Sequence, residues 1–529
     1  MSRASLDARS RLREARDAFK SRHGDLHIPE LWYAFQGKIA AVLAGGGARG
    51  GYEAGALLAM QDAGLPTHLI TATSIGSING ASYAAHATGL VGNAEPLVDA
   101  WFELTPTAVG VEWTRYTWML FGLVATFSGI TNLTYYILQT KGLEIHLAHP
   151  ALAWGSLCLA GITVLLFHDQ LPYLWFLLRR LLRGSRWRPA RRRLAVSAVA
   201  NLVVASFIVS IFESLDIPGA LRDLLSRKPL LVFLGLVVLV IIQQVRRRAN
   251  PRVGRIWGRI LRLPFRTGIF SNFERSRFLR RYIPADRLRT TPIRVVLTST
   301  DLESGVLRFF TNADPASFLN ERGVERAFAK RELIRMDDLM DAVIASSALP
   351  IAYEPLDLDG RLHADGAIVG SQPIRPAIRL GSDVLFLISM EPPGGPRGAM
   401  HTFVDVGLRA LDILMQRNLQ ADIGLLEQAN SQIETAAAQM GMRPEDVVIE
   451  FEGRMFRYVK AFSIRPDQPI ENSILDFGGR ATGETILLGY KDAVAQIEAF
   501  ANYVNGGGGF QDKRRTLPLE LVRPRRKSN

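Results

Sequence analysis

The segment that decides the fold runs from Lys38 to Gly51 and reads KIAAVLAGGGARGG. Its first half, Lys38–Ala44, is a short apolar run that ends in glycine, which is typical of a buried parallel strand. The glycines lead into Tyr52–Asp62, which has the composition of a helix. The order strand, glycine loop, helix predicts an α/β domain. Such a loop directs backbone N–H groups and the positive end of a helix at an anion.

The glycine loop has two interpretations. The spacing of Gly45, Gly47 and Gly50 fits the G-x-G-x-x-G pattern of dinucleotide-binding turns. Those turns require an acidic residue about 20 positions further on for the ribose, and the stretch from Ala63 to Asn79 contains no Asp or Glu. The other interpretation is an oxyanion hole, which requires a nucleophile at the end of the next strand.

A serine stands at the end of the next predicted strand. That strand is His68–Thr73 (HLITAT), and Ser74 and a helix of small residues follow it. A serine nucleophile on a strand-to-helix turn needs small residues two positions before and after it. Here these are Ala72 and Gly76, so the usual G-x-S-x-G reads A-T-S-I-G. A serine that caps the next helix is the alternative, but the glycine loop at the same end of the sheet favours catalysis.

A serine nucleophile requires a base, and none of the nine histidines follows an acid at a strand end. A carboxylate in a polar turn is an alternative when hydrogen bonds and a dry pocket adjust its pKa. The best candidate is Asp365 in RLHADGAIVGSQPI (361–374), where a strand-like segment turns at Asp365, Gly366 and Ala367. A triad esterase that uses His401, which follows Asp365 in the chain, stays open as a rival.

Three motifs therefore stand in order along the chain: GGGARG (45–50), TSIGSING (73–80) and DGA (365–367). This ordered set resembles the patatin-like phospholipase family. Further segments that resemble the family are 295–305, 345–356, 380–393 and 473–493. The resemblance covers about residues 38–110 and 268–500. It implies a three-layer α/β domain with a mostly parallel central sheet.

The resemblance also implies a chemistry: a serine acyl hydrolase for membrane lipids, of phospholipase or lysophospholipase type, with a Ser–Asp dyad. Carried over to this chain, Ser74 is the nucleophile and Asp365 the general base. The oxyanion hole is assigned to the backbone of Gly45, Gly46, Gly47, Ala48 and Arg49, and motif support to Gly50, Ala72, Gly76, Gly366 and Ala367. No metal or other cofactor is expected. Because Ala72 replaces the usual glycine, a weak or inactive membrane scaffold with the same fold stays open.

The net charge of +13 is concentrated in one internal segment of the 529-residue chain. Residues 112–262 carry 20 Lys and Arg against 6 Asp and Glu, so the remainder is nearly neutral. Four long apolar runs alternate with this charge: Trp118–Leu138, Ala151–Phe167, Leu194–Phe212 and Leu230–Val245. A bilayer core needs about 20 apolar helical residues, so the runs predict a transmembrane insertion of about four spans, the last one short. The alternation argues for a lipid bilayer as the partner and against nucleic acid.

The arginines between the runs predict the orientation. Eight lie between the second and third runs and seven follow the fourth, whereas the other two loops are nearly balanced. The positive-inside rule then gives a multi-pass protein with a cytoplasmic catalytic domain, as in a bacterial inner membrane. The single cysteine, Cys158, excludes a disulfide framework.

The expected organisation has five parts. These are a polar, solvated helical segment (1–37), two parts of the α/β domain (38–110 and 266–505), the insertion (111–265) and a basic, disordered tail (506–529). The polar N-terminus has no apolar core of a secretory signal.

Overall fold

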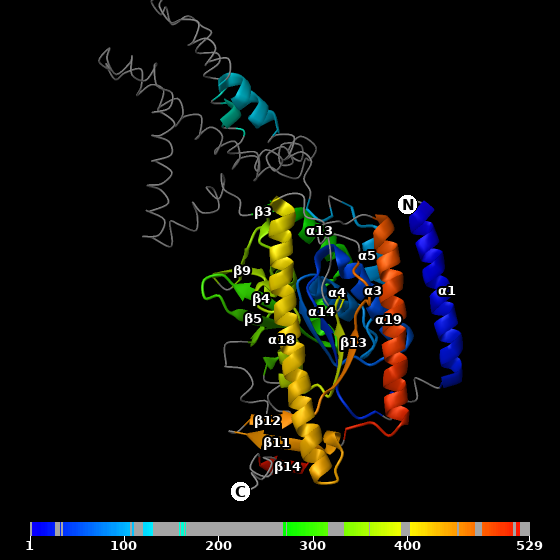
Figure 1. Ribbon diagram of the computed structural model, residues 1–529. Coiled ribbons are helices and arrows are strands. Elements are labelled where there is room, and N and C mark those ends of the chain that lie inside the picture. The colour runs from blue at the N-terminus through cyan, green and yellow to red at the C-terminus, as the bar shows by residue number, and fades with distance from the viewer. Residues whose placement is uncertain are drawn as a thin grey trace, which may run out of the picture. The chain divides into compact units, whose positions relative to one another are not determined.

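The computed structural model describes residues 3–26, 32, 35–105, 108–110, 120–130, 158, 160–162, 164, 268–270, 272–315, 333–358, 360–392, 403–451, 454–470, 479–510 and 515–518. The chain divides into two compact units. The first combines Met1–Val111 with Thr267–Asn529, and the second is Glu112–Arg266. The first unit contains the α/β domain (Figure 1).

A nine-stranded sheet forms the centre of the first unit (Figure 1). Its strands are β1 (Ile39–Leu43), β2 (Leu69–Thr73), β4 (Arg294–Asp301), β5 (Leu307–Thr311), β6 (Leu333–Arg335), β8 (Leu356–Leu358), β9 (Arg361–Asp365), β10 (Val384–Ile388) and β13 (Lys460–Ile464). The order is β13-β10-β1-β2-β4-β5-β6, with β9 paired to β4 and β8 to β9. The strands from β13 to β4 are mutually parallel, which confirms the expected α/β fold with a mostly parallel sheet.

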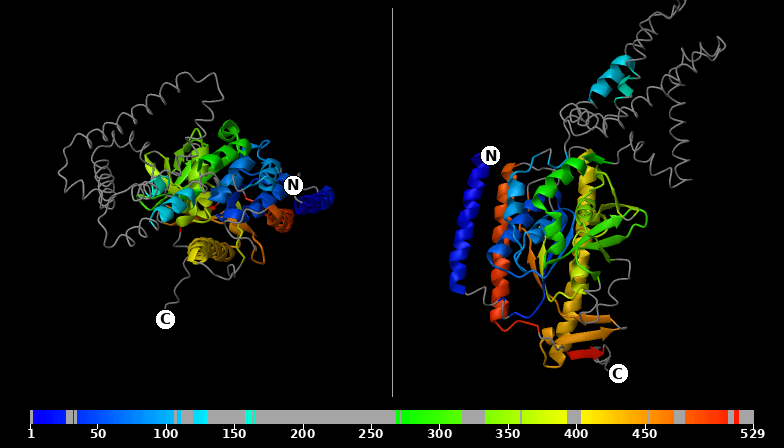
Figure 2. Two further views of the ribbon diagram at one scale, coloured as in Figure 1. Left: turned by 90° about the horizontal axis from the view of Figure 1, so that it is seen from above. Right: turned by 180° about the vertical axis from the view of Figure 1, so that it is seen from behind.

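Helices cover both faces of the sheet because side chains alternate along each buried strand. Ile39, Ala41 and Leu43 of β1 pack into one core, and Ala40 and Val42 into another. Helices of the first face are α3 (Gly51–Asp62), α4 (Ile75–Ala85), α5 (Glu95–Phe102), α13 (Asn272–Tyr282), α14 (Ala285–Thr290), α16 (Met340–Ser346) and α19 (Gly479–Asn505). On the second face lie α17 (Ile374–Arg379) and the part of α18 (Phe403–Gln439) around Leu426, whereas Ile433, Ala436 and Ala437 of α18 belong to the first core. Seen from above, α18 (yellow) lies on one side of the sheet and α3 and α4 (blue) on the other (Figure 2).

The N-terminal helix is less solvated than expected. α1 spans Arg3–Leu26, and its Leu12 and Phe19 are buried. The Phe19 ring packs edge-on against Tyr490 of α19, with centroids 6.0 Å apart. The prediction of a solvated helix is wrong for the face of α1 that carries Leu12 and Phe19. A few apolar residues at helical spacing are enough to bury one face of a charged helix.

The C-terminal tail contains a strand. β14 (Arg515–Pro518) pairs in parallel with β11 (Val447–Phe451), which also pairs with β12 (Arg454–Arg457). The prediction of a disordered tail from residue 506 is therefore wrong for Arg515–Pro518. Composition did not indicate this strand, because an edge strand offers backbone N–H and C=O groups to any extended segment, whatever its charge.

The second unit contains the predicted insertion. Residues 120–130 of the first predicted span are helical, as are 158, 160–162 and 164 of the second. These segments pack closely: a Cβ on Gly129 would lie 2.6 Å from Cys158 N, and one on Gly161 would lie 2.5 Å from Thr126 N. The third and fourth runs, and most of the first two, lie outside the described residues. Within the residues described above, no helix is both long enough and apolar enough to cross a membrane.

Candidate active site

The two predicted catalytic side chains meet on one edge of β4. β2 runs parallel to β4, and its last residue, Thr73, lies opposite Thr298. β9 runs antiparallel to β4, and its last residue, Asp365, lies opposite Ser299. β5 occupies the other edge of β4. The carboxyl ends of β2 and β9 therefore meet end to end, and the residue after β2, Ser74, is placed beside Asp365.

Ser74 stands on a strained turn between β2 and α4. Its φ is 56° and its ψ −125°, and among the described residues it is the one non-glycine residue with positive φ. Such backbone strain at a strand-to-helix turn exposes a nucleophile. The turn also needs Gly76, because a Cβ there would lie 2.8 Å from the Cβ of Leu43 in β1. The small residue two positions after Ser74 is thus required by the approach of α4 to β1.

Asp365 accepts a direct hydrogen bond from the nucleophile. The Ser74 hydroxyl donates to Asp365 Oδ2 over 2.6 Å, and the Ala367 N–H donates to Oδ1 over 2.9 Å. The backbone of Asp365 is held as well, because the Thr300 hydroxyl donates to its carbonyl over 2.9 Å. Gly366 must be glycine, since a Cβ there would lie 2.5 Å from Thr298 Oγ1.

The environment of Asp365 raises its pKa. Burial raises the pKa to about 6, although hydrogen bonds from the Ser74 hydroxyl and the Ala367 N–H and the charge of Arg275 each lower it. A carboxylate with this pKa is ionised at neutral pH and still accepts a proton readily. The dyad thus has the geometry and the acidity that general-base catalysis requires.

The glycine loop borders the nucleophile. Gly46 and Gly47 line the same pocket as Ser74, and Gly47–Gly50 form the short helical turn η1. The Gly45 N–H already donates to Ser371 O over 3.0 Å, and the Arg49 N–H donates to Gly46 O over 3.3 Å. The buried Arg49 guanidinium forms an ion pair with Glu391, which braces the loop.

A buried polar network supports the glycine loop from behind. Asn79 Nδ2 donates to Gly50 O over 2.9 Å and to Glu53 Oε2 over 2.8 Å. Trp101 Nε1 donates to Asn79 Oδ1 over 3.0 Å. Burial raises the pKa of Glu53 well above its ordinary value, although the hydrogen bond from Asn79 lowers it. Asn79 therefore ties the nucleophile helix to the loop and to the pocket wall.

Ala72 fits this fold without distortion. It is fully buried in β2 and belongs to the core under α4. The facing residue on α4 is Gly80, where an added Cβ would lie 3.6 Å from the Ala72 methyl. This is an ordinary van der Waals distance, so the methyl group of Ala72 does not crowd α4.

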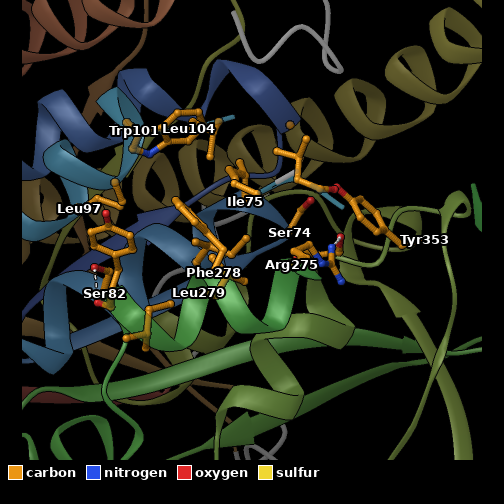
Figure 3. Close-up of a pocket in the computed structure, with 18 of the residues that line it drawn as sticks. Ser74, Ile75, Ser82, Leu97, Trp101, Leu104, Arg275, Phe278, Leu279 and Tyr353 are labelled. Carbon is orange, nitrogen blue, oxygen red and sulfur yellow. Dashed lines mark hydrogen bonds between the residues drawn. The ribbon is translucent and has the colours of Figure 1, made fainter. Parts of the chain in front are cut away.

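An apolar pocket extends from Ser74 (Figure 3). It is partly open to solvent, and with that open part its empty space is about 970 Å³. Three helices each contribute one face to it, with residues at helical spacing. The lining residues are Ile75, Ile78 and Ser82 of α4, Leu97, Ala100 and Trp101 of α5 with Leu104 beyond it, and Arg275, Phe278, Leu279 and Tyr282 of α13. The pocket runs from Ser74 and Arg275 to Ser82 and Leu97 (Figure 3).

Three residues at the dyad were not predicted from the sequence. Ser346 Oγ accepts the Ser74 N–H over 3.0 Å and lies 2.6 Å from Ser77 Oγ. Arg275 and Tyr353 stand at the dyad end of the pocket (Figure 3). The only sequence signal was a pair of serines in the apolar segment 343–350.

The structure describes His363, which lies two residues before Asp365, but not the rival base His401. His363 is buried; its Nδ1 lies 2.8 Å from Ser299 Oγ, and its ring packs edge-on against Phe310. It is a scaffold residue. His401 lies outside the described residues. Within the described ranges, no group of three or more His, Cys, Asp or Glu side chains is placed to hold a metal ion.

Comparisons with known proteins show the family of this chain. The family model for patatin-like phospholipase matches residues 41–378, more than half of the chain. Lysophospholipase NTE1 of Chaetomium globosum is 48% identical over 65 residues, 12% of this chain and 4% of that protein. Human patatin-like phospholipase domain-containing protein 6 is 34% identical over 122 residues, 20% of this chain and 9% of that protein. The chain thus spans under a tenth of these relatives' length.

Among solved structures, VipD from Legionella pneumophila is similar to this chain over 88% of this chain and 67% of the VipD chain. The TM-score is 0.30 and the sequence identity 12%, a likeness too weak to add to the fold.

Proposed function

This chain belongs to the patatin-like phospholipase family of serine acyl hydrolases, and we propose that it hydrolyses acyl esters of membrane phospholipids or lysophospholipids through Ser74 and Asp365. The observation that carries the proposal is the 2.6 Å hydrogen bond from the Ser74 hydroxyl to the buried carboxylate of Asp365. This contact connects a nucleophile directly to its base, with no histidine between them.

The proposed reaction has two halves. Asp365 takes the hydroxyl proton while Ser74 Oγ attacks the ester carbonyl, and the proton then passes to the departing alcohol. Water attacks the resulting acyl-enzyme, Asp365 accepts its proton, and that proton returns to Ser74 as the fatty acid leaves. The backbone N–H groups of Gly46, Gly47 and Ala48 are the proposed oxyanion donors, because those of Gly45 and Arg49 already have partners. Each such donor contributes about 3 kcal/mol to the transition state.

The pocket supports a long-chain acyl group as the part of the substrate that the enzyme holds. Its walls beyond the dyad are almost entirely aliphatic and aromatic side chains from α4, α5 and α13. Burying such a chain releases about 0.8 kcal/mol for each methylene group. We propose that the acyl chain lies along these helices and that the alcohol leaves at the dyad end.

We also propose that the second unit is the four-span membrane insertion and that the α/β domain lies on the cytoplasmic side. The charge pattern of residues 112–262 supports this orientation. In residues 120–130, six large apolar side chains are at least 40% exposed: Leu120, Phe121, Leu123, Val124, Phe127 and Ile130. Helices that meet at Gly129 and Gly161 are typical of membrane bundles, where small residues let backbones approach.

The two connections between the α/β domain and the proposed insertion support access of lipid to the dyad. The Tyr353 hydroxyl donates to Val109 O over 2.7 Å, just before the insertion begins. The Tyr353 ring also contacts Phe270, just after the insertion ends, with centroids 5.5 Å apart. Tyr353 lines the pocket, so the chain leaves the α/β domain and returns to it beside the dyad.

The decisive experiment uses the full chain in detergent, a p-nitrophenyl butyrate assay and a fluorophosphonate probe. We expect turnover and covalent labelling of Ser74, and loss of turnover in both Ser74→Ala and Asp365→Asn. Ser431→Ala, at an exposed position of α18, is the matched control and should keep wild-type activity.

Two outcomes would replace the proposal. A folded protein with neither turnover nor labelling would be a scaffold. Loss of activity in a folded His401→Ala would indicate a histidine base, as in the rival triad, and full activity in that variant would remove the rival.

A further inference from the structure

One short segment touches both members of the dyad. Ser346, the last residue of α16, accepts the Ser74 N–H through its hydroxyl. Two residues later, Ala348 O accepts the Asp365 N–H over 2.9 Å. A displacement of this segment would therefore move the nucleophile and the base relative to each other.

Arg275 of α13 holds that segment in place. Its Nη1 donates to Ser347 O over 2.6 Å, and its Nη2 donates to Ile344 O over 2.9 Å. Carbonyls in the last turn of a helix have no partner within the helix, and a cation at that end also suits the helix dipole. Nη2 further donates to Asn272 Oδ1 over 2.8 Å, and the guanidinium lies 3.8 Å from the ring centroid of Tyr353. The arginine is thus fixed from three sides.

The same guanidinium is the charged group that acts on Asp365. The other groups around Asp365 are the Ser74 hydroxyl, the Ala367 N–H and the Thr300 hydroxyl, which are uncharged. Nearby on the same sheet, His363 is engaged with Ser299. Asp301 is engaged with Arg361. Within the described residues, the positive charge that favours ionisation of Asp365 therefore comes from Arg275.

Arg275 is not placed to bind a lipid phosphate. Only 4% of its surface is exposed, and both terminal nitrogens donate to protein oxygens. Removing it from these carbonyls would leave several buried acceptors without partners.

We propose that Arg275 is a positioning residue of the dyad: it fixes the segment Ile344–Ala348, which carries contacts to Ser74 and Asp365. The inference rests on the proposed function. It assigns a role to α13, which otherwise contributes Phe278, Leu279 and Tyr282 to the pocket. Arg275 touches no reacting atom, so its effect is on alignment and on the ionisation of the base.

The test compares Arg275→Met, Arg275→Lys and the control Arg277→Met in the full chain, with kcat and KM for p-nitrophenyl butyrate measured from pH 5 to 9. Arg277 is on the same helix, but its side chain is 70% exposed. In Arg275→Met we expect kcat/KM to fall about 100-fold, because small misplacements of reacting groups are costly. The acid limb of the plot of kcat/KM against pH should also move to higher pH, because the positive charge that lowers the pKa of Asp365 is gone.

Arg275→Lys separates the two roles. Lysine keeps the charge but cannot donate to two carbonyls in the geometry of a guanidinium. We expect its acid limb to stay at the wild-type pH while kcat falls about tenfold.

A folded Arg275→Met with the wild-type kcat/KM and acid limb would overturn the inference. If Arg275→Met does not fold, Arg275→Lys decides, and a wild-type kcat there overturns it. Failure of the proposed function looks different, because the wild-type protein itself would then show neither turnover nor labelling of Ser74.

Discussion

Thr73 and Asp365 lie next to each other on one edge of β4, the first opposite Thr298 and the second opposite Ser299. One strand is parallel to β4 and the other antiparallel, so two carboxyl ends point at each other. The Ser74 hydroxyl reaches Asp365 from this junction although 291 positions separate the two residues. The strand register therefore brings the dyad together. The distance between Ser74 Oγ and Asp365 Oδ2 is set by backbone pairing rather than by flexible loops.

The buried base should cost the protein stability. The pKa of Asp365 rises from 3.8 to about 6 in the folded protein, so the native state favours the neutral carboxyl. Stability is therefore lost as the pH rises from about 4 through 6, by about 3 kcal/mol in total. Asp365→Asn, which cannot ionise, should melt at a higher temperature than wild type at neutral pH. Melting curves near pH 4.5 and 7.5 should show this difference shrinking at the lower pH; a constant difference would contradict the prediction.

Ser346 should matter for turnover more than for substrate binding. Ser346→Ala removes the acceptor of the Ser74 N–H and leaves that buried donor unpaired next to a strained turn. We expect kcat to fall about tenfold with little change in KM, and the free energy of unfolding to fall by about 1–2 kcal/mol. Steady-state kinetics and urea unfolding measure both. Wild-type kcat in a folded Ser346→Ala would show that the hydroxyl does not hold the nucleophile.

The far end of the pocket should set the acyl chain length. Ser82 lies seven residues after Ile75 on the same helix, which is about 10 Å along its axis. Ser82→Leu should lower kcat/KM for p-nitrophenyl dodecanoate about tenfold relative to the butyrate ester, because the added side chain fills the end of the pocket. Ser82→Ala is the matched control, since it adds no volume, and its ratio should match wild type. Equal ratios in all three proteins would mean that the chain lies elsewhere.

The orientation of the insertion can be tested by reporter fusions in a bacterial inner membrane. Fusions after residues 145, 190, 220 and 265 should report outside, inside, outside and inside, following the arginine-rich loops. Alkaline phosphatase activity and fluorescence of a cytoplasmic reporter give opposite readings at each site. An outside reading after residue 190 would reverse the proposed topology.

The sequence predicted the parts of the site that depend on local geometry. The glycine loop and the turn at Ser74 are each formed within a few residues, and glycine is required there by close backbone approach, as at Gly76. The parallel strands were also predictable, because continuous apolar runs such as Ile39–Leu43 are buried on both faces. Asp365 could be singled out only through the ordered motifs, since its distance from Ser74 depends on the pairing of β9 with β4.

The parts that could not be predicted depend on tertiary partners. α13 contains four arginines, and Arg275 looks no different in sequence from Arg277, which is exposed. What distinguishes Arg275 is the C-terminus of α16, some 70 residues later in the chain. Ser346 is similar, because only the fold shows that its hydroxyl faces Ser74.

The strand order has a consequence for biosynthesis. β1 and β2 leave the ribosome first, but β10 and β4, the neighbours on their outer edges, are translated only after the insertion. Until then the nascent pair has two open edges, which are sites for wrong pairing. Ser74 is therefore translated well before Asp365. The dyad can assemble only after residues 112–266 and the strands that follow them have been translated. A chaperone that covers the two open edges would protect the nascent pair during that interval.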